Sequence, residues 1–329
     1  MIRLPAAVAA ALISFLVALA GGCAAPNREL PFEVVAQIRT GNNPHGIWFT
    51  PSGDRAFVAC SGSNRIDVID ARRFEMIDTL PGGSVPLDVL GSADGRYLIL
   101  TQFRGAELLK MRSIGGPYEQ RWPIGEGGSL FSPRIISDQA YLVCELSDEL
   151  LVFDRRRLEV VARHRTGARP YPCDVTRDGR IAYVPCRDDG SVSVIDLGTG
   201  ATIRSVKVGP QPQGGALTRD DRLYLVAESG QDSIAIIYTA TNELAGRITK
   251  GVGPRPFSVA VTADGQYALI NNAGGSTLSV MEVATQEVLG EIETGRQPIV
   301  IRFHPDGRHV FVSNELSGTV TVLRRKVES

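Results

Sequence analysis

The chain is a sequence repeat, because a short Gly-x-x-Pro element recurs along it at an almost constant spacing. The prolines of this element are Pro44, Pro86, Pro170, Pro212, Pro256 and Pro298, and Gly128 stands in the slot of a missing third proline. Successive positions are 42 residues apart, except for one step of 44. A fixed period of this length is typical of repeat architectures in which each repeat is one supersecondary unit.

A second marker, a turn position, recurs with the same period as the proline. Nine residues after each slot comes a turn position, at Gly53, Gly95, Ser137, Gly179, Asp221, Gly265 and Gly307. Four of these turns read Asp-Gly, which is a strong signal for a hairpin. Apolar residues alternate before the turn, and further strand-like runs follow it, such as 66–70 and weaker outer runs at 158–162 and 287–292. Four strands in about 42 residues match one propeller blade.

The two ends of the chain complement each other. The seventh repeat contains three strand-like runs, at 299–303, 310–313 and 319–323, and then stops. A strand-like run at 32–38 precedes the first repeat and can supply the missing strand. Such pairing would leave no open edge in the ring. We therefore predict an all-β fold over residues 32–329, a seven-bladed propeller of four-stranded blades, closed by an N-terminal strand that completes the last blade.

Segments at the same place in three repeats resemble the YVTN repeat. They are Phe57-Val58-Ala59-Cys60, Tyr183-Val184-Pro185-Cys186 and Phe311-Val312-Ser313-Asn314. The resemblance extends over residues 32–323 and implies the propeller fold. Proteins of this kind include envelope proteins of unknown role, propeller subunits of amine dehydrogenases and lactonase-like enzymes, so the resemblance implies no single activity.

The N-terminus has the layout of an export signal. Arg3 is followed by an apolar run from Ala6 to Ala20 and then by Gly21-Gly22-Cys23. We predict a signal peptide over 1–22, and the residues before Cys23 resemble the lipobox of bacterial lipoproteins. This resemblance implies a lipid on Cys23, a lipidated tether over 23–31 and a protein anchored in the periplasm or at the outer envelope. Because Ala20 stands where leucine is commonest, simple secretion stays an alternative.

The charge balance limits the class of partner. Arg3 is the only charged residue in the first 22, so the remaining chain has 34 Lys and Arg against 36 Asp and Glu, a formal net charge of −2. Such a balance gives no general attraction to nucleic acid. We expect a monomer that contacts the membrane only through its lipid and binds a protein partner or a small anionic ligand.

The residues that flank the repeat prolines define a predicted binding site. In a propeller, the loops between blades and the loops between second and third strands emerge on one face. The predicted ligand-binding residues on that face are His45, Arg169, Tyr171, Gln211, Gln213, Arg255, Phe257 and Gln297. Arg169 and Arg255 suit a carboxylate or phosphate, with Tyr171 and Phe257 as stacking walls. The alternative interpretation is a solvated rim without a ligand.

His45 is the one histidine expected on this face, and it is the candidate for acid–base chemistry. An imidazole acts as a base only with a substrate and an orienting group within reach. The ring of residues next to the prolines offers no carboxylate to orient it, so no catalytic residue is predicted. The leading hypothesis is a non-catalytic binding or scaffold protein; the alternative is a lactonase-like hydrolase or a propeller subunit of a periplasmic redox complex.

The cysteines favour a structural interpretation. Cys60, Cys144 and Cys186 share one repeat position at the end of the second strand, and Cys173 falls in an apolar column. Buried free thiols are expected, with a Cys144–Cys186 disulfide left open. Because no Cys-x-x-Cys pair or metal-binding His spacing occurs, neither a metal nor a cofactor is predicted.

The repeated acidic residues also favour a structural role. Asp70, Asp154 and Asp196 each follow a third strand, where the geometry of the turn accounts for an aspartate. The charged loops between second and third strands, such as the one that contains Glu145, are expected to be solvated.

Overall fold

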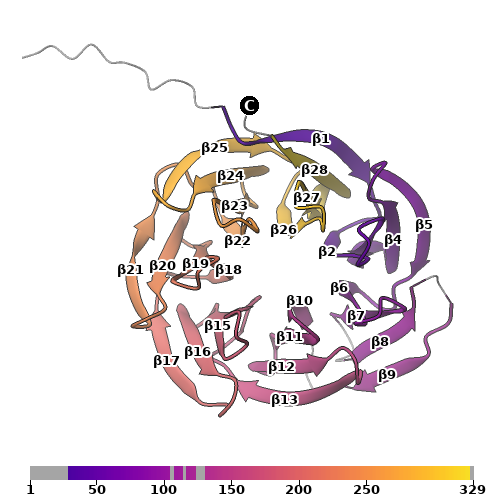
Figure 1. Cartoon of the computed structure of the whole chain (residues 1–329), viewed down its shortest axis with the longest axis horizontal. Helices are drawn as coiled ribbons and strands as arrows, with labels where there is room; N and C mark the ends of the chain where they lie inside the picture. Colours follow the sequence, from indigo (N-terminus) through magenta and orange to yellow (C-terminus); the bar gives the residue numbers. More distant parts are fainter. Residues whose placement is uncertain (1–28, 104–106, 114–115, 124–129, 327–329) are drawn as a thin grey trace, which may run out of the picture.

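The computed structural model describes residues 29–103, 107–113, 116–123 and 130–326. Its strands form seven antiparallel sheets of four strands each, arranged in a ring (Figure 1). The predicted all-β, seven-bladed propeller is therefore confirmed. Cys23 and the predicted signal peptide lie outside the described residues. Within the described ranges, no helix is long and apolar enough to cross a membrane.

The blades are numbered here from the first repeat. The innermost strands of blades 1 to 7 are β2 (Pro44–Phe49), β6 (Pro86–Gly91), β10 (Leu130–Ile136), β14 (Asp174–Val175), β18 (Pro212–Leu217), β22 (Pro256–Val261) and β26 (Pro298–Phe303). The second strands are β3 (Arg55–Cys60), β7 (Tyr97–Gln102), β11 (Gln139–Cys144), β15 (Ile181–Cys186), β19 (Leu223–Glu228), β23 (Tyr267–Asn272) and β27 (His309–Asn314).

Two further strands complete each blade. The third strands are β4 (Arg65–Asp70), β8 (Glu107–Arg112), β12 (Glu149–Asp154), β16 (Ser191–Asp196), β20 (Ser233–Tyr238), β24 (Thr277–Glu282) and β28 (Thr319–Arg325). The outer strands are β5 (Glu75–Pro81), β9 (Gln120–Pro123), β13 (Glu159–Arg165), β17 (Thr202–Lys207), β21 (Glu243–Ile248), β25 (Glu287–Glu293) and β1 (Phe32–Arg39). Two short 3-10 turns, η1 (Ser61–Ser63) and η2 (Glu315–Ser317), join second to third strands.

The turn between first and second strands explains the second sequence marker. In blade 4 the Thr176 hydroxyl donates to the Asp178 carboxylate at 2.6 Å, and the Ile181 N–H donates to the same hydroxyl at 3.0 Å. Gly179 takes a φ of 71°, which a residue without Cβ adopts at little cost. The side chains thus satisfy the backbone of the turn and set where β15 begins.

The ring closes as predicted. β1 pairs antiparallel with β28 and forms the outer strand of blade 7, as Figure 1 shows. Val34 lies opposite Leu323 and Ile38 lies opposite Val320. Residues from the two ends of the chain therefore share one sheet, and blade 7 needs both to be complete.

Apolar side chains fill the space between neighbouring blades. Tyr183 of blade 4 stacks on Tyr224 of blade 5 with ring centroids 5.1 Å apart, and both are fully buried. Trp48 and Phe57 of blade 1, with ring centroids 5.7 Å apart, belong to the apolar cluster that extends over blades 1, 2 and 3. Each large aromatic ring removes roughly 150–250 Å² from water, so these layers hold adjacent blades together.

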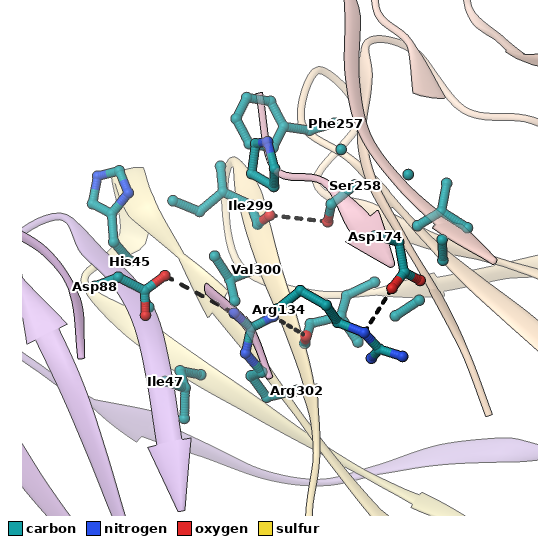
Figure 2. Close-up of a pocket in the computed structure, with 18 of the residues that line it drawn as sticks. His45, Ile47, Asp88, Arg134, Asp174, Phe257, Ser258, Ile299, Val300 and Arg302 are labelled. Carbon is teal, nitrogen blue, oxygen red and sulfur yellow. Dashed lines mark hydrogen bonds and ion pairs between the residues drawn. The ribbon is translucent and has the colours of Figure 1, made fainter. Parts of the chain in front are cut away.

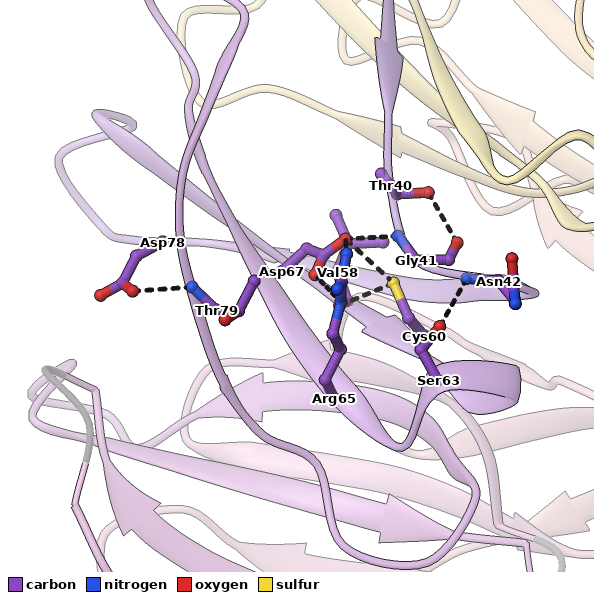
Figure 3. Close-up of polar contacts among 10 residues, drawn as sticks. All are labelled: Thr40, Gly41, Asn42, Val58, Cys60, Ser63, Arg65, Asp67, Asp78 and Thr79. Atoms are coloured by element: carbon purple, nitrogen blue, oxygen red, sulfur yellow. Dashed lines mark hydrogen bonds and ion pairs between the residues drawn. The ribbon is translucent and has the colours of Figure 1, made fainter.

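In blades 1, 4, 5 and 6 the N–H of the first glycine of the repeat donates to a side chain of the same blade. In blade 1 the Gly41 N–H donates to the Asp67 carboxylate at 2.6 Å, and the Cys60 thiol donates to the same oxygen at 3.4 Å (Figure 3). Arg65 forms an ion pair with this carboxylate at 2.7 Å. A Cβ on Gly41 would lie 2.9 Å from the Cys60 Cβ, which explains the glycine of the repeat.

Like Cys60, the other described cysteines lie in the interior of the blades. The described cysteines, which are Cys60, Cys144, Cys173 and Cys186, are all buried free thiols. Burial raises the pKa of Cys144 to about 11 and that of Cys173 to about 12. The prediction of buried free thiols is therefore confirmed for the described cysteines, and thiols that stay protonated are poor nucleophiles.

The aspartate after the third strand also has a structural role. The Asp70 carboxylate accepts the backbone N–H groups of Arg72 and Arg73, both at 3.0 Å, and these bonds lower its pKa. Asp154 and Asp196 bind the following turn in the same way.

Two details differ from the sequence pattern. Leu158, predicted to begin an outer strand, has a φ of 59° in the turn before β13, which begins at Glu159. The inner strand of blade 4 is reduced to two residues, because Pro170 and Pro172 lack the N–H that a strand ladder needs. Neither difference changes the order of the strands.

Candidate functional site

Small residues on the inner strands leave a cavity in the centre of the ring. The residues two and four positions after the repeat prolines contribute much of its wall, and several of them are small: Gly46, Gly214, Ala216, Ser258 and Ala260. The cavity has a volume of about 490 Å³. This volume lies within the usual range for small-molecule sites, roughly 300–1,000 Å³.

Two ion pairs cross between blades inside this cavity (Figure 2). Arg134 of blade 3 contacts Asp174 of blade 4, with Nε 2.6 Å from Oδ1. Arg302 of blade 7 approaches Asp88 of blade 2, with Nη2 3.9 Å from Oδ2. The side chains of Asp88 and Asp174 are only 2% and 7% exposed, whereas those of Arg302 and Arg134 are 31% and 43% exposed. The guanidinium groups therefore present more surface to the cavity than the carboxylates do.

The protein backbone holds the carboxylates in place. Asp174 accepts the N–H of Val175 at 2.7 Å and, with its other oxygen, the N–H of Leu217 at 2.8 Å. Asp88 accepts the N–H of Val89 at 2.8 Å. These short backbone hydrogen bonds fix the two carboxylates behind the arginines.

A glycine in blade 1 allows the Arg302–Asp88 pair to form. Blade 1 lies between blades 7 and 2, and a Cβ on its Gly46 would lie 1.9 Å from Asp88 Oδ1. Any side chain at this position would occupy the space of the carboxylate. Glycine is therefore required for Asp88 to reach toward the cavity.

Among the residues that the structure describes, the ion pair of Arg302 is a long one. Arg302 Nη1 donates to the Ile301 carbonyl at 3.2 Å, in addition to the long contact with Asp88. Burial lowers the pKa of Arg302, the attraction of Asp88 opposes this, and the positive charge of Arg134 lowers the pKa further. Two guanidinium groups thus share one region, where an added anion would favour their charged forms.

A second polar group lies at the mouth of the cavity. His45 Nε2 is 3.6 Å from Glu315 Oε1, and the Gln297 amide donates to the same carboxylate. The hydrogen bond from His45 lowers the pKa of Glu315, although burial opposes it. The ring of residues next to the prolines offers no carboxylate, as the sequence indicated, but a carboxylate from another segment contacts His45. Glu315 comes from η2, outside the ring of residues next to the prolines.

Arg169 is held by a partner of its own. Its Nε lies 2.6 Å from Glu145, whose side chain is only 5% exposed. The expectation that this loop is solvated is wrong at Glu145, because the carboxylate is buried against the arginine. Tyr171 and Phe257, the predicted stacking walls, contact each other edge to face with centroids 6.2 Å apart.

The predicted residues are only partly brought together. His45 and Phe257 line the cavity, and Gln297 touches it through Glu315. The other predicted residues, Arg169, Tyr171, Gln211, Gln213 and Arg255, are not part of its wall. Gln211 and Arg255 are exposed, whereas Gln213 is buried.

The residue before the repeat proline has the same backbone conformation in the described blades. Arg169, Gln211, Arg255 and Gln297 have φ values of 57°, 53°, 51° and 55°. This left-handed conformation belongs to the turn of the repeat. A polar residue in this column is therefore explained by the turn and does not by itself mark a site.

Sequence reasoning did not identify Asp88, Arg134, Asp174 and Arg302. A signal was present, because a charged residue interrupts an apolar inner strand in blades 2, 4 and 7, as in Ile301-Arg302-Phe303. The apolar alternation that predicted the first strand lies mainly three and five positions after the proline. The residues two and four positions after it carry most of these charges.

Comparisons with known proteins agree with the fold. The model of the YNCE-like β-propeller family matches residues 78–223. No curated protein matches the sequence. Of the solved structures, 1647 chains match, so the architecture is too widespread to specify an activity. One is a chain of the hydrazine synthase from Kuenenia stuttgartiensis, 18% identical, with a TM-score of 0.75 over 87% of this chain and 97% of that one. At this identity the likeness shows the fold alone.

Proposed function

We propose that this chain, a seven-bladed β-propeller of the YVTN-repeat type, is a non-catalytic binding protein that takes a small anionic ligand into its central cavity. The proposal includes an anchor at the cell envelope through a lipid on Cys23. The observation that carries the binding role is the exposure of Arg302 and Arg134 to the cavity, with their acidic partners fixed behind them.

The chemistry of the wall favours a carboxylate that carries an apolar group. A guanidinium group has five N–H donors in a planar fork that matches a carboxylate. Around the two arginines the cavity is lined by apolar residues, among them Ile47, Trp48 and Phe257. A ligand with one anionic end and an apolar body would satisfy both parts of the wall.

Calorimetry with defined probes tests the proposal. We expect benzoate or succinate to bind, and benzamide, which is neutral and similar in shape to benzoate, to bind more weakly. The Arg302→Gln variant should weaken anion binding by about 10- to 150-fold, the equivalent of losing a hydrogen bond to a charged group. Arg96, which is 81% exposed in its side chain and outside the cavity wall, gives the matched control Arg96→Gln.

The outcomes separate the alternatives. Tighter binding of inorganic phosphate than of the carboxylates would assign the site to phosphorylated ligands. Equal binding of benzoate and benzamide, or unchanged binding by the Arg302→Gln variant, would contradict the proposal.

The His45–Glu315 pair favours a second candidate, a lactonase-like hydrolase. A carboxylate next to an imidazole can orient it as a general base at the cavity mouth. Turnover of an aliphatic lactone that is lost in both His45→Gln and Glu315→Gln would support this candidate. Turnover equal to the background rate in the wild-type protein would exclude it for that substrate.

Exposed apolar side chains favour a protein partner as another occupant of the same face. Phe103, Leu146 and Leu316 lie in loops between second and third strands and are 38%, 62% and 54% exposed. A pull-down of the anchored protein should recover one partner that the Leu146→Glu, Leu316→Glu double variant loses. Recovery of the same proteins by both chains would contradict a partner at these loops.

A further inference from the structure

Blade 7 departs from the repeat at the turn between its first and second strands. In five other blades the residue six positions after the proline is Thr or Ser, and its hydroxyl donates to an aspartate of the same turn. These residues are Thr50, Ser92, Thr176, Thr218 and Thr262. Blade 7 carries His304 at this position, and His309 begins the following strand. In blade 7, two imidazoles therefore lie at a turn that a threonine or serine hydroxyl stabilises in the five other blades.

The two imidazoles converge on one carboxylate oxygen. His309 Nδ1 lies 2.7 Å from Asp306 Oδ2, and His304 Nδ1 lies 3.1 Å from the same atom. These groups are termed the blade-7 cluster, and their ligand atoms all lie within 4.8 Å of one another. Two imidazole nitrogens and one carboxylate oxygen form a common donor set for first-row transition metals.

Hydrogen bonds give His304 the tautomer that metal binding needs. Its Nε2 lies 2.6 Å from the Gly53 carbonyl, which can only accept, so the ring proton is on Nε2 and the Nδ1 lone pair faces the cluster. Histidine ligands of metals typically make this kind of bond with their other nitrogen. The Asp306 N–H also approaches Nδ1 at 3.1 Å, and a metal ion would displace this local contact.

Aromatic neighbours hold both rings. Phe311 stacks on His304 with centroids 6.2 Å apart, and Phe74 contacts His309 edge to face at 5.2 Å. The other oxygen of the Asp306 carboxylate accepts the backbone N–H groups of Arg308 at 2.7 Å and His309 at 3.0 Å. The carboxylate and the two rings are therefore positioned before any ion arrives.

We propose that the blade-7 cluster binds one divalent transition-metal ion, such as Zn²⁺ or Co²⁺, through His304 Nδ1, His309 Nδ1 and Asp306 Oδ2, with water at the remaining positions. The cluster lies at the end of β26 away from Glu315 and the cavity mouth, and its three proposed ligands are not among the residues that line the cavity. Since His304 binds Gly53 of blade 1, an ion here would stabilise the contact between the last blade and the first.

The test is a titration of the folded full chain, without an affinity tag, with Co²⁺ followed by absorption and with Zn²⁺ in competition. We expect one equivalent to bind. The variants His304→Thr and His309→Tyr should each weaken binding by at least the roughly 10- to 100-fold typical of losing a supporting contact. Other blades carry Thr262 and Tyr267 at these positions, so both variants preserve the local pattern of the fold.

Asp220→Asn changes the matched turn position of blade 5, which has no histidine, and serves as the control. Binding should be unchanged in this variant. Absence of a stoichiometric site in the wild-type chain, or equal affinity in the two histidine variants, would overturn the proposal. A thiolate-to-cobalt charge-transfer absorption would place the ion on cysteine and would overturn it as well.

Discussion

Single side chains around the central cavity differ in function according to how deeply they are buried. The backbone fixes Asp88 and Asp174, while Arg134 and Arg302 keep surface toward the cavity. Arg169 and Arg255 were predicted as ligand-binding residues because they stand next to the repeat prolines. The sequence does not reveal that Arg169 has a buried partner, since Glu145 becomes its neighbour only when the loops fold.

The lowered pKa of Glu315 predicts a specific pH dependence. A carboxyl group whose pKa is depressed by folding contributes stability above its unfolded pKa, near 4.5, and loses that contribution as the pH falls through the folded value. The difference in the free energy of unfolding between the wild type and Glu315→Gln should therefore be larger above pH 4.5 than well below it. Urea unfolding at several pH values measures it.

The exposed Glu75 provides the control for this prediction. Glu75→Gln should show a smaller difference at all pH values. A constant difference for Glu315→Gln from neutral pH to well below pH 4.5 would contradict the assigned ionisation.

Strands were largely predictable, because each is repeated seven times with the same turn chemistry. The alternation before each Asp-Gly turn and the missing outer strand of the last repeat indicated the seven sheets and the closure by β1. The exceptions are local. The start of β13 and the shortened β14 depend on a left-handed residue and on prolines, which periodicity alone does not resolve.

β1, the strand that closes the ring, should contribute measurably to the free energy of unfolding. Ile38 of β1 is 5% exposed in the seam with blade 1, and Ile38→Ala should lower the free energy of unfolding by about 2 to 5 kcal/mol, as for other buried isoleucines. Val34 of the same strand is 47% exposed, so Val34→Ala should change it by within about 0.5 kcal/mol. Similar effects of both variants in chemical denaturation would contradict the closure.

The assembled ring creates a site that no single repeat contains. The charges of the cavity come from blades 2, 3, 4 and 7, and the pair between Arg302 and Asp88 forms past Gly46 of blade 1. The repeat pattern predicts which loops share a face but not which inner side chains meet. That depends on the position of each blade around the ring and on the small residues between them.

Gly46 should therefore be essential for the packing around the central cavity. Gly46→Ala places a Cβ against Asp88 and should destabilise the protein by about 1 to 3 kcal/mol, the usual effect of overpacking. Gly246→Ala is the control, because no atom lies within 4 Å of a Cβ at that position. Equal unfolding midpoints for the wild type and Gly46→Ala would contradict this prediction, because the cavity wall would then accommodate the Cβ without loss of stability.

A crystal structure of the protein with para-bromobenzoate would locate the ligand without ambiguity. Binding by the two arginines predicts an anomalous bromine peak inside the central cavity and a carboxylate within hydrogen-bond distance of Arg302 or Arg134. A carboxylate that turns away from both guanidinium groups, or bromine peaks confined to the outer surface, would contradict the proposed anion site.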